Sequence, residues 1–184
     1  VVCVARDITE RKRAEASAAE RTRELAALQA LGLVVSSSLS LNQVGKAALQ
    51  GILAAVQPDL AYLFLREGDK LHLQEVAPQE ALPRLGIIPE HRVGECMCGL
   101  TVKEEKPLYS RDIHTDSRCT WDECKAAGIR SFATLPLRSG PEIIGVIGLA
   151  SLADRDFEAS SDFLETLAHQ VSLALANARH YELA

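Results

Sequence analysis

Four of the five cysteines lie close together in the sequence, as the pairs Cys96–Cys98 and Cys119–Cys124. Thiolate sulfur is a soft ligand that suits zinc, Cu(I) and iron–sulfur clusters. A fold that brings both pairs together would supply four sulfurs to one tetrahedral ion or to a two-iron cluster. Neither spacing is that of a standard zinc finger or ferredoxin. Cys96, Cys98, Cys119 and Cys124 are therefore candidate ligands of zinc or of an iron–sulfur cluster.

Two other interpretations of these thiols stay open. Cys96 and Cys98 begin a predicted short helix, and the dipole at a helix N-terminus stabilises a thiolate and lowers the thiol pKa. That placement favours redox or disulfide chemistry. Free cysteine is also among the most buried residue types, so all four side chains can simply pack in a core. The sequence leaves metal binding, redox chemistry and packing as alternatives.

The side chains around the cysteines add further candidates. The single tryptophan, Trp121, lies between the second pair, where its ring either covers a bound ligand or anchors a short helix against the core. His91 and His114 are alternative metal ligands. We expect Asp116 to cap a loop turn and Arg118 to be solvated or paired at the surface.

The elements that must position these residues can be predicted from composition and periodicity. Residues 10–31 contain no glycine or proline and are rich in Ala, Glu, Arg and Leu, which predicts a helix whose only apolar seam is Leu25, Leu28 and Leu31. The remaining elements follow from turn residues and apolar spacing. They are a helix at 41–56, strands at 60–65 and 71–77, an irregular stretch at 82–95, short helices at 94–106 and 120–127, an extended piece at 107–110, strands at 131–137 and 142–151, and a helix at 158–181.

This order predicts an α+β fold. Two hairpins far apart in sequence can pair into one central antiparallel sheet, with the terminal helices on one face and a loop and short-helix lid over a pocket on the other. Residues 143–149 are apolar on both faces, so this strand is expected at the centre. Functional groups tend to lie in a pocket of this kind.

Composition excludes several classes of function. The chain has 184 residues, of which 47% are hydrophobic, and a net charge of −5 with both signs mixed. This length predicts one domain with appendages, and the acidic balance argues against nucleic acid as a partner. No apolar run approaches the roughly 20 residues that span a bilayer, so we expect no membrane contact by these residues. No glycine-rich phosphate loop, Ser/His/Asp set or paired-carboxylate motif is recognisable.

Two parts of the chain resemble known bacterial signalling families. Residues 1–12, which read VVCVARDITERK, resemble the last strand and exit motif of a PAS domain. The rest resembles a GAF domain, in the segments GECMCG at 94–99, KPL at 106–108, DI at 112–113, AGIRSFATLPL at 127–137, IGVIGL at 144–149 and ANAR at 176–179. The resemblance divides the chain into the end of a PAS domain (1–8), a signalling helix (9–31) and a GAF domain (32–184).

The resemblance implies a cytoplasmic sensory module in a parent protein that is either soluble or attached to a membrane elsewhere. GAF domains bind small ligands or cofactors between the sheet and the middle loops. They dimerise through terminal helices and regulate an attached kinase, cyclase or transcription factor. For this chain we expect a parallel homodimer and a histidine kinase of a two-component system as the output domain, with a diguanylate cyclase or a regulator as the alternatives. The acidic motif of cyclic-nucleotide-binding GAF domains is not evident. Cys124 is followed by Lys125 rather than by the histidine common in bilin-carrying relatives.

A different function class stays open beside the sensor. Cys98 followed by Gly99, and Cys124 placed before Leu135, resemble the cysteine placement of free methionine-R-sulfoxide reductase, a GAF-fold enzyme. In such an enzyme a thiolate attacks the sulfoxide and a second cysteine resolves the intermediate. A structural dimerisation module with no ligand is the third alternative. The PAS-like segment and the long helices favour the non-catalytic sensor.

Overall fold

The computed structural model describes residues 2–36, 40–81 and 90–182. Its order of elements agrees with the predicted one except at the N-terminus and at residues 90–92. The helices are α1 (Val2–Ser36), α2 (Leu41–Val56), α4 (Cys96–Glu104), α5 (Asp122–Ala126) and α6 (Ser161–Glu182), with 3₁₀ turns η1 (Gln79–Ala81) and η2 (Glu158–Ser160). The strands are β1 (Leu60–Glu67), β2 (Lys70–Ala77), β3 (Glu90–Arg92), β4 (Leu108–Ser110), β5 (Ser131–Ser139) and β6 (Glu142–Ser151).

The strands form one six-stranded sheet in the order β3-β2-β1-β6-β5-β4. All neighbouring strands are antiparallel. The two hairpins join where β1 pairs with β6, with Leu63 opposite Ile147. Strand β6 is interior and buried along nearly its whole length, as its apolar sequence predicts. The α+β prediction with a central antiparallel sheet is therefore confirmed.

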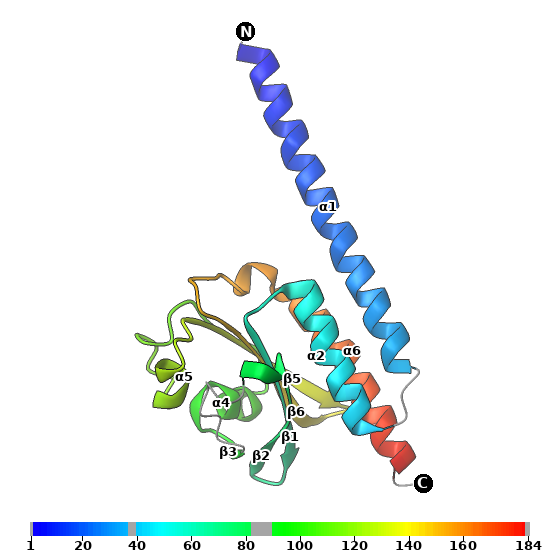
Figure 1. The fold of residues 1–184 in the computed structure, drawn as a ribbon, viewed down its shortest axis with the longest axis vertical. Coiled ribbons are helices and arrows are strands. Elements are labelled where there is room, and N and C mark those ends of the chain that lie inside the picture. Colours follow the sequence, from blue (N-terminus) through cyan, green and yellow to red (C-terminus); the bar gives the residue numbers. More distant parts are fainter. Residues whose placement is uncertain (1, 37–39, 82–89, 183–184) are drawn as a thin grey trace.

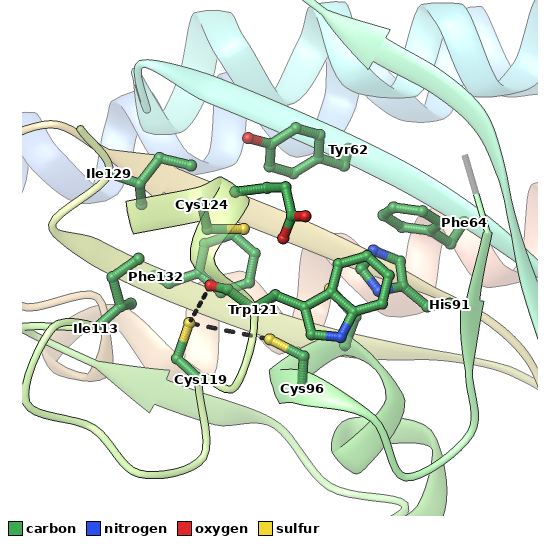
Figure 2. Close-up of a pocket in the computed structure, with 12 residues that line it drawn as sticks. Tyr62, Phe64, His91, Cys96, Ile113, Cys119, Trp121, Cys124, Ile129 and Phe132 are labelled. Atoms are coloured by element: carbon green, nitrogen blue, oxygen red, sulfur yellow. Dashed lines mark hydrogen bonds between the residues drawn. The ribbon is translucent and has the colours of Figure 1, made fainter. Parts of the chain in front are cut away.

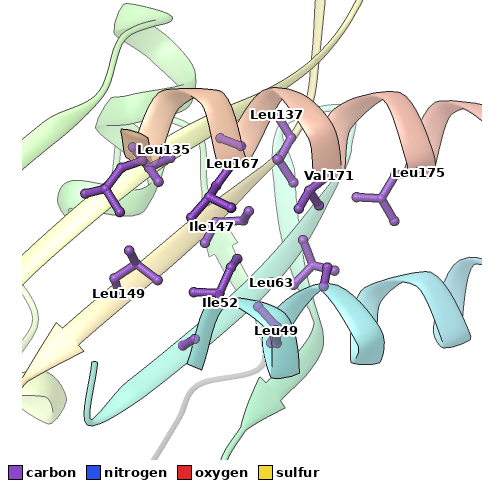
Figure 3. Close-up of a cluster of buried hydrophobic side chains, with 14 of the residues drawn as sticks. Leu49, Ile52, Leu63, Leu135, Leu137, Ile147, Leu149, Leu167, Val171 and Leu175 are labelled. Carbon is purple, nitrogen blue, oxygen red and sulfur yellow. The ribbon is translucent and has the colours of Figure 1, made fainter. Parts of the chain in front are cut away.

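Helices α2 and α6 cover one face of this sheet (Figures 1 and 3). Ser40 caps α2, because its Oγ accepts a hydrogen bond from the Gln43 backbone N–H at 3.3 Å. The apolar positions of both helices recur every three or four residues, so each helix turns one stripe toward the sheet. The resulting helix-face core is aliphatic apart from one aromatic ring, and includes Leu49, Ile52, Leu63, Leu135, Ile147, Leu149, Leu167 and Val171.

The opposite face of the sheet is covered by α4, α5 and the loops that flank them (Figure 1). We call these segments, residues 93–107 and 111–130, the lid. The cluster beneath the lid contains three aromatic rings from the sheet, Tyr62, Phe64 and Phe132, together with three buried thiols. The two faces of one sheet thus carry different chemistry.

Helix α1 projects well beyond the sheet (Figure 1), and the side chains of residues 8–23 are exposed. Near its end Leu28 packs against the helix-face core, whereas Leu25 remains 62% exposed. The side chain of Leu31 lies outside those described. None of the helices in the described ranges is both long enough and apolar enough to cross a membrane.

Two predicted elements differ from the structure. Residues 1–12 were expected to begin with the last strand of a PAS domain, but the chain is helical from Val2 onward. A strand needs a neighbour for its backbone hydrogen bonds, whereas a helix satisfies its own, and no strand of the sheet reaches this end of the chain. The stretch at 82–95 was expected to be irregular, but residues 90–92 form the edge strand β3; residues 82–89 lie outside the described residues. Three residues are too few to give an alternating pattern.

Candidate functional site

All four clustered cysteines line one pocket between the sheet and the lid (Figure 2). Its volume is about 40 Å³. Since a cavity needs roughly 10–15 Å³ to hold one water, the pocket admits a very small solute unless the lid moves. Its wall consists of Tyr62, Phe64, His91, Ile113, Trp121, Glu123, Ile129 and Phe132 besides the cysteines. The predicted convergence of the two cysteine pairs on one cleft is therefore confirmed.

The first pair is positioned by a tight contact between α4 and β3. The Gly94 backbone N–H donates to the Gly99 carbonyl oxygen at 2.8 Å. A Cβ atom at Gly99 would lie 2.1 Å from the Arg92 carbonyl oxygen, so only glycine allows this approach. Cys96, at the start of α4, has a φ of 52°, in the left-handed region that residues with a side chain rarely adopt.

The second pair depends on Asp116 and Arg118, which cap a loop turn and form an ion pair as predicted. The Asp116 carboxylate accepts hydrogen bonds from the Arg118 backbone N–H and guanidinium at 2.7–3.0 Å. The same guanidinium donates to the Tyr109 carbonyl oxygen on β4 at 2.7 Å. Its hydrogen bond lowers the pKa of Asp116 to about 2. These contacts fix the turn that places Cys119 at the pocket.

Cys96 and Cys119 lie closest to each other, with 3.9 Å between their sulfur atoms. The hydrogen bond between Cys96 and Cys119, with smaller contributions from backbone hydrogen bonds at Met97, Trp121 and Thr120, lowers the pKa of Cys96 to about 6. The same hydrogen bond, with burial, raises the pKa of Cys119, which keeps its proton. Cys96 is therefore the thiolate of the pair near neutral pH.

The other two thiols differ from these. The prediction of a lowered thiol pKa at the start of the helix holds for Cys96. It is wrong for Cys98, because burial raises the pKa of that thiol. Burial also raises the pKa of Cys124 to about 12. Both side chains point into apolar surroundings, where desolvation outweighs the helix dipole. Within the described ranges, no three or more His, Cys, Asp or Glu side chains are grouped so that they could hold a metal ion. This arrangement does not fit the predicted zinc or iron–sulfur site.

His91 has a larger role at the pocket than its sequence position indicated. Its ring lies between Trp121, at a centroid distance of 4.1 Å, and Phe64, at 4.8 Å (Figure 2). His91 is only 7% exposed, and its Nδ1 atom is buried without a hydrogen-bond partner in the described part of the chain. Burial lowers the pKa of His91 to about 4, so the ring is neutral at pH 7. His114, by contrast, is exposed and lines no part of the pocket.

Trp121 lies at the pocket, as predicted, immediately before α5. It is half-buried, stacks on His91 and packs against the cluster beneath the lid, so it borders the cavity and also contacts the core. Sequence analysis did not find the aromatic wall. Tyr62, Phe64 and Phe132 alternate with helix-face residues on β1 and β5, and this alternation of aromatic and aliphatic side chains is the signal that could have identified it.

Comparisons with known proteins agree with this architecture. The family model described as "GAF domain" matches residues 38–176. The GAF domain of a phosphoenolpyruvate-protein phosphotransferase from Coxiella burnetii is similar, with 20% identity over 89% of this chain and 98% of that one and a TM-score of 0.76. The free methionine-R-sulfoxide reductase from Neisseria meningitidis, solved with its substrate, is 17% identical over 85% of this chain and 90% of that one, with a TM-score of 0.72.

No curated protein matches the chain. At these identities the solved structures establish the fold alone. The family model, however, covers most of the chain, and it matches the same residues that form the sheet, the lid and the pocket. The chain belongs to the GAF domain family, whose members are sensory and ligand-binding modules.

Proposed function

We propose that this GAF domain is a cytoplasmic sensory module that binds a small uncharged ligand in the pocket beneath the lid. The observation that carries the proposal is His91 Nδ1, a buried polar atom at the wall of a cavity that has no hydrogen-bond partner among residues 2–36, 40–81 and 90–182. A buried polar group without a hydrogen bond is costly, and a ligand that supplies the bond recovers that free energy.

The pocket wall indicates the chemistry of the ligand. Besides His91, six of its side chains are aromatic or aliphatic: Tyr62, Phe64, Ile113, Trp121, Ile129 and Phe132. Since His91 is neutral, Nδ1 offers one hydrogen bond without a charge. A compact molecule with an apolar body and one polar group suits such a wall. A larger ligand requires Trp121 to move outward.

A binding test follows from this wall. Phenol and pyrazole are small uncharged probes that carry one apolar face and a hydrogen-bonding group. We expect either probe to change the fluorescence of Trp121, the only tryptophan, and the ¹⁵N shift of the His91 imidazole. His91→Phe should weaken binding at least tenfold, and His114→Phe, at an exposed histidine, should not. Equal binding by the wild type and His91→Phe would remove the basis of the proposal.

The terminal helices are the proposed route to an output domain, which we infer to be a histidine kinase. On strand β6, Val146 packs beneath the lid and Ile147 packs against α2 and α6. A displacement of β6 on the pocket side therefore also displaces the surface against which the two helices pack. The Arg138 backbone N–H also donates to Ser172 Oγ on α6 at 2.9 Å. We infer further that residues 1–8 end a PAS domain, on the strength of their sequence motif.

We propose that α1 and α6 pair with the same helices of a second, parallel chain. Leu25 on α1 and Leu173 on α6 support this, since they are 62% and 50% exposed. The double variant Leu25→Glu/Leu173→Glu should shift light scattering from dimer toward monomer. Leu152→Glu, at a leucine 53% exposed outside these helices, is the matched control and should leave the dimer intact. A wild-type chain that scatters only as a monomer would contradict the dimer.

We infer that the domain is not itself a reductase. The enzyme alternative places its chemistry on Cys98 and Cys124, and burial raises the pKa of both, which disfavours the attacking thiolate. We expect no reduction of free methionine-R-sulfoxide with dithiothreitol as reductant. Turnover that Cys98→Ser or Cys124→Ser abolishes would establish the enzyme instead.

A further inference from the structure

Cys96 and Cys119 belong to different segments of the lid, and yet they are the one pair of thiols in hydrogen-bond contact among residues 90–182. Cys96 begins α4, and Cys119 follows the turn that Asp116 and Arg118 fix. Figure 2 shows their side chains pointing toward each other at the edge of the pocket. The ligand proposed above needs neither thiol, so the pair is a separate feature of the lid.

We propose that Cys96 and Cys119 are a peroxide-reactive pair that forms a reversible disulfide. The sulfur atoms lie 3.9 Å apart, and a disulfide bond of about 2.05 Å requires an approach of about 2 Å. Neither residue belongs to the sheet. Cys96 is at the first position of a nine-residue helix and Cys119 is in a loop, so side-chain rotation and a small lid movement close the distance.

The pocket gives the oxidant access to the pair. Cys96 and Cys119 are only 5% and 4% exposed to the outside, but both line the cavity. A volume of about 40 Å³ suits a molecule with two heavy atoms, such as hydrogen peroxide. A larger oxidant requires Trp121 to move outward and hydrogen peroxide does not, so the pocket favours small peroxides.

The surroundings of Cys96 assign the roles of the two sulfurs. Backbone N–H groups at Met97, Thr120 and Trp121 and the Cys119 thiol stabilise negative charge on Cys96 Sγ. Cys96 is therefore the attacking thiolate, and Cys119, which retains its proton, is the resolving thiol. Cys98 and Cys124 have raised pKa values and stay reduced.

The reaction has two balanced steps. The Cys96 thiolate attacks one oxygen of hydrogen peroxide, the O–O bond breaks, and the departing hydroxide takes up the proton that Cys96 had released, giving one water and a sulfenic acid. The Cys119 sulfur then attacks the sulfenic sulfur. The S–O bond breaks, and the second hydroxide leaves with the Cys119 proton as water. Two thiols lose two electrons in total, and the peroxide gains them.

The disulfide would join α4 to the loop before α5 and so restrain the lid over the pocket. The Cys119 sulfur already lies 3.9 Å from the carbonyl oxygen of Trp121, so the bond forms beside the single tryptophan. Oxidation should therefore change Trp121 fluorescence, and dithiothreitol should restore it.

The test treats the reduced full chain with a small molar excess of hydrogen peroxide, followed by alkylation and mass spectrometry. We expect a loss of two hydrogens, two fewer alkylated thiols, and a cross-link between the tryptic peptides 93–103 and 119–125 whose fragment ions place it at Cys96 and Cys119. Cys119→Ser should instead leave a sulfenic acid at Cys96, which dimedone traps. Cys124→Ser, the matched control at another pocket cysteine, should form the same cross-link as the wild type.

Several outcomes would overturn the proposal. They are an unchanged mass in the folded wild type, a cross-link through Cys98 or Cys124, or a dimedone adduct elsewhere than Cys96 in Cys119→Ser. His91→Phe separates this inference from the proposed ligand, because it should lose probe binding and retain the disulfide. The wild-type result alone decides the pairing if a serine variant fails to fold.

Discussion

The two faces of the sheet differ in what covers them and in what they contain. The helix face is closed by α2 and α6, of 16 and 22 residues, and its core is aliphatic but for Phe157. The lid face is closed by α4 and α5, of nine and five residues, and by loops. There the core mixes three aromatic rings with three buried thiols and borders a cavity.

The difference follows from how each cover is built. Long helices present a continuous apolar stripe and satisfy their own backbone groups, so nothing polar needs to be buried with them. Short helices and loops leave backbone N–H groups free to face the pocket, where they stabilise the Cys96 thiolate. The helix face therefore has a continuous apolar core, whereas the lid face holds the thiols and the pocket.

The largest effect should come from the helix face. Leu63 and Leu71 are both fully buried leucines of the sheet, Leu63 in the helix-face core and Leu71 beneath the lid. Leu63→Ala should lower the free energy of unfolding by about 3–5 kcal/mol, because two long helices cannot collapse into the space left. Leu71→Ala should cost about 2–3 kcal/mol, since a lid of short segments settles more easily. Urea unfolding measures the free energy of unfolding of both variants. An equal or larger loss of stability in Leu71→Ala would contradict the proposed difference between the two faces of the sheet.

The next effect depends on pH and belongs to the lid face. His91 has a folded-state pKa of about 4 against an ordinary value of 6.5. The unfolded chain therefore binds a proton before the folded chain does, so stability is complete above pH 6.5 and falls as the pH drops toward 4. The loss from this residue is up to about 3 kcal/mol.

His91→Phe keeps an aromatic ring between Phe64 and Trp121 and removes the proton-binding site. The difference between wild type and variant in urea unfolding should therefore change across pH 6.5 to 4 and stay constant above pH 7. A difference that is the same at every pH would show that burial does not disfavour the charged ring.

A smaller effect is expected at Gly148, under the aromatic wall. A Cβ atom there would lie 3.1 Å from both Phe132 and Tyr62, closer than ordinary contact. Gly148→Ala should cost about 1–2 kcal/mol and weaken phenol binding, because the rings must move toward the cavity. Adding Phe132→Leu removes one crowded ring, so the double variant should lose less stability than the two single losses together. If the double variant lost as much stability as the two single variants together, the proposed steric crowding at Gly148 would be contradicted.

The fold could be predicted from the sequence because its signals are local and repeated. The stripes of α2 and α6 and the turn at Gly140 between β5 and β6 each specify an element without reference to the rest of the chain. The edge strand β3 could not be predicted, because its three residues owe their conformation to pairing with β2.

The site was predictable in location but not in detail. Cys96 and Cys98 both lie in the first turn of α4, and a dipole argument treats them alike. Both side chains are buried, but hydrogen bonds to a loop distant in sequence outweigh burial at Cys96, whereas burial dominates at Cys98, so their pKa values shift in opposite directions. The role of His91 likewise depends on its ring contacts with Trp121 and Phe64. Both residues are distant from His91 in the sequence, so no local motif could indicate these contacts.

The smallest expected effect is that of a substitution at Cys124, which distinguishes this cysteine from Cys96 and Cys119. Cys124 is half-buried with a pKa of about 12, so it is a neutral thiol that packs at the edge of the lid cluster. Cys124→Ala removes one sulfur atom that borders an existing cavity, and should cost less than about 1 kcal/mol. It should also leave the alkylation rate of Cys96 unchanged at pH 7, because the hydrogen bonds to that thiolate come from Cys119 and from backbone groups. Rates of iodoacetamide labelling, read by mass spectrometry, test this. A large slowing at Cys96 would mean that the thiols act as one group of charge-coupled sulfurs and that the pair is not the functional unit of the lid.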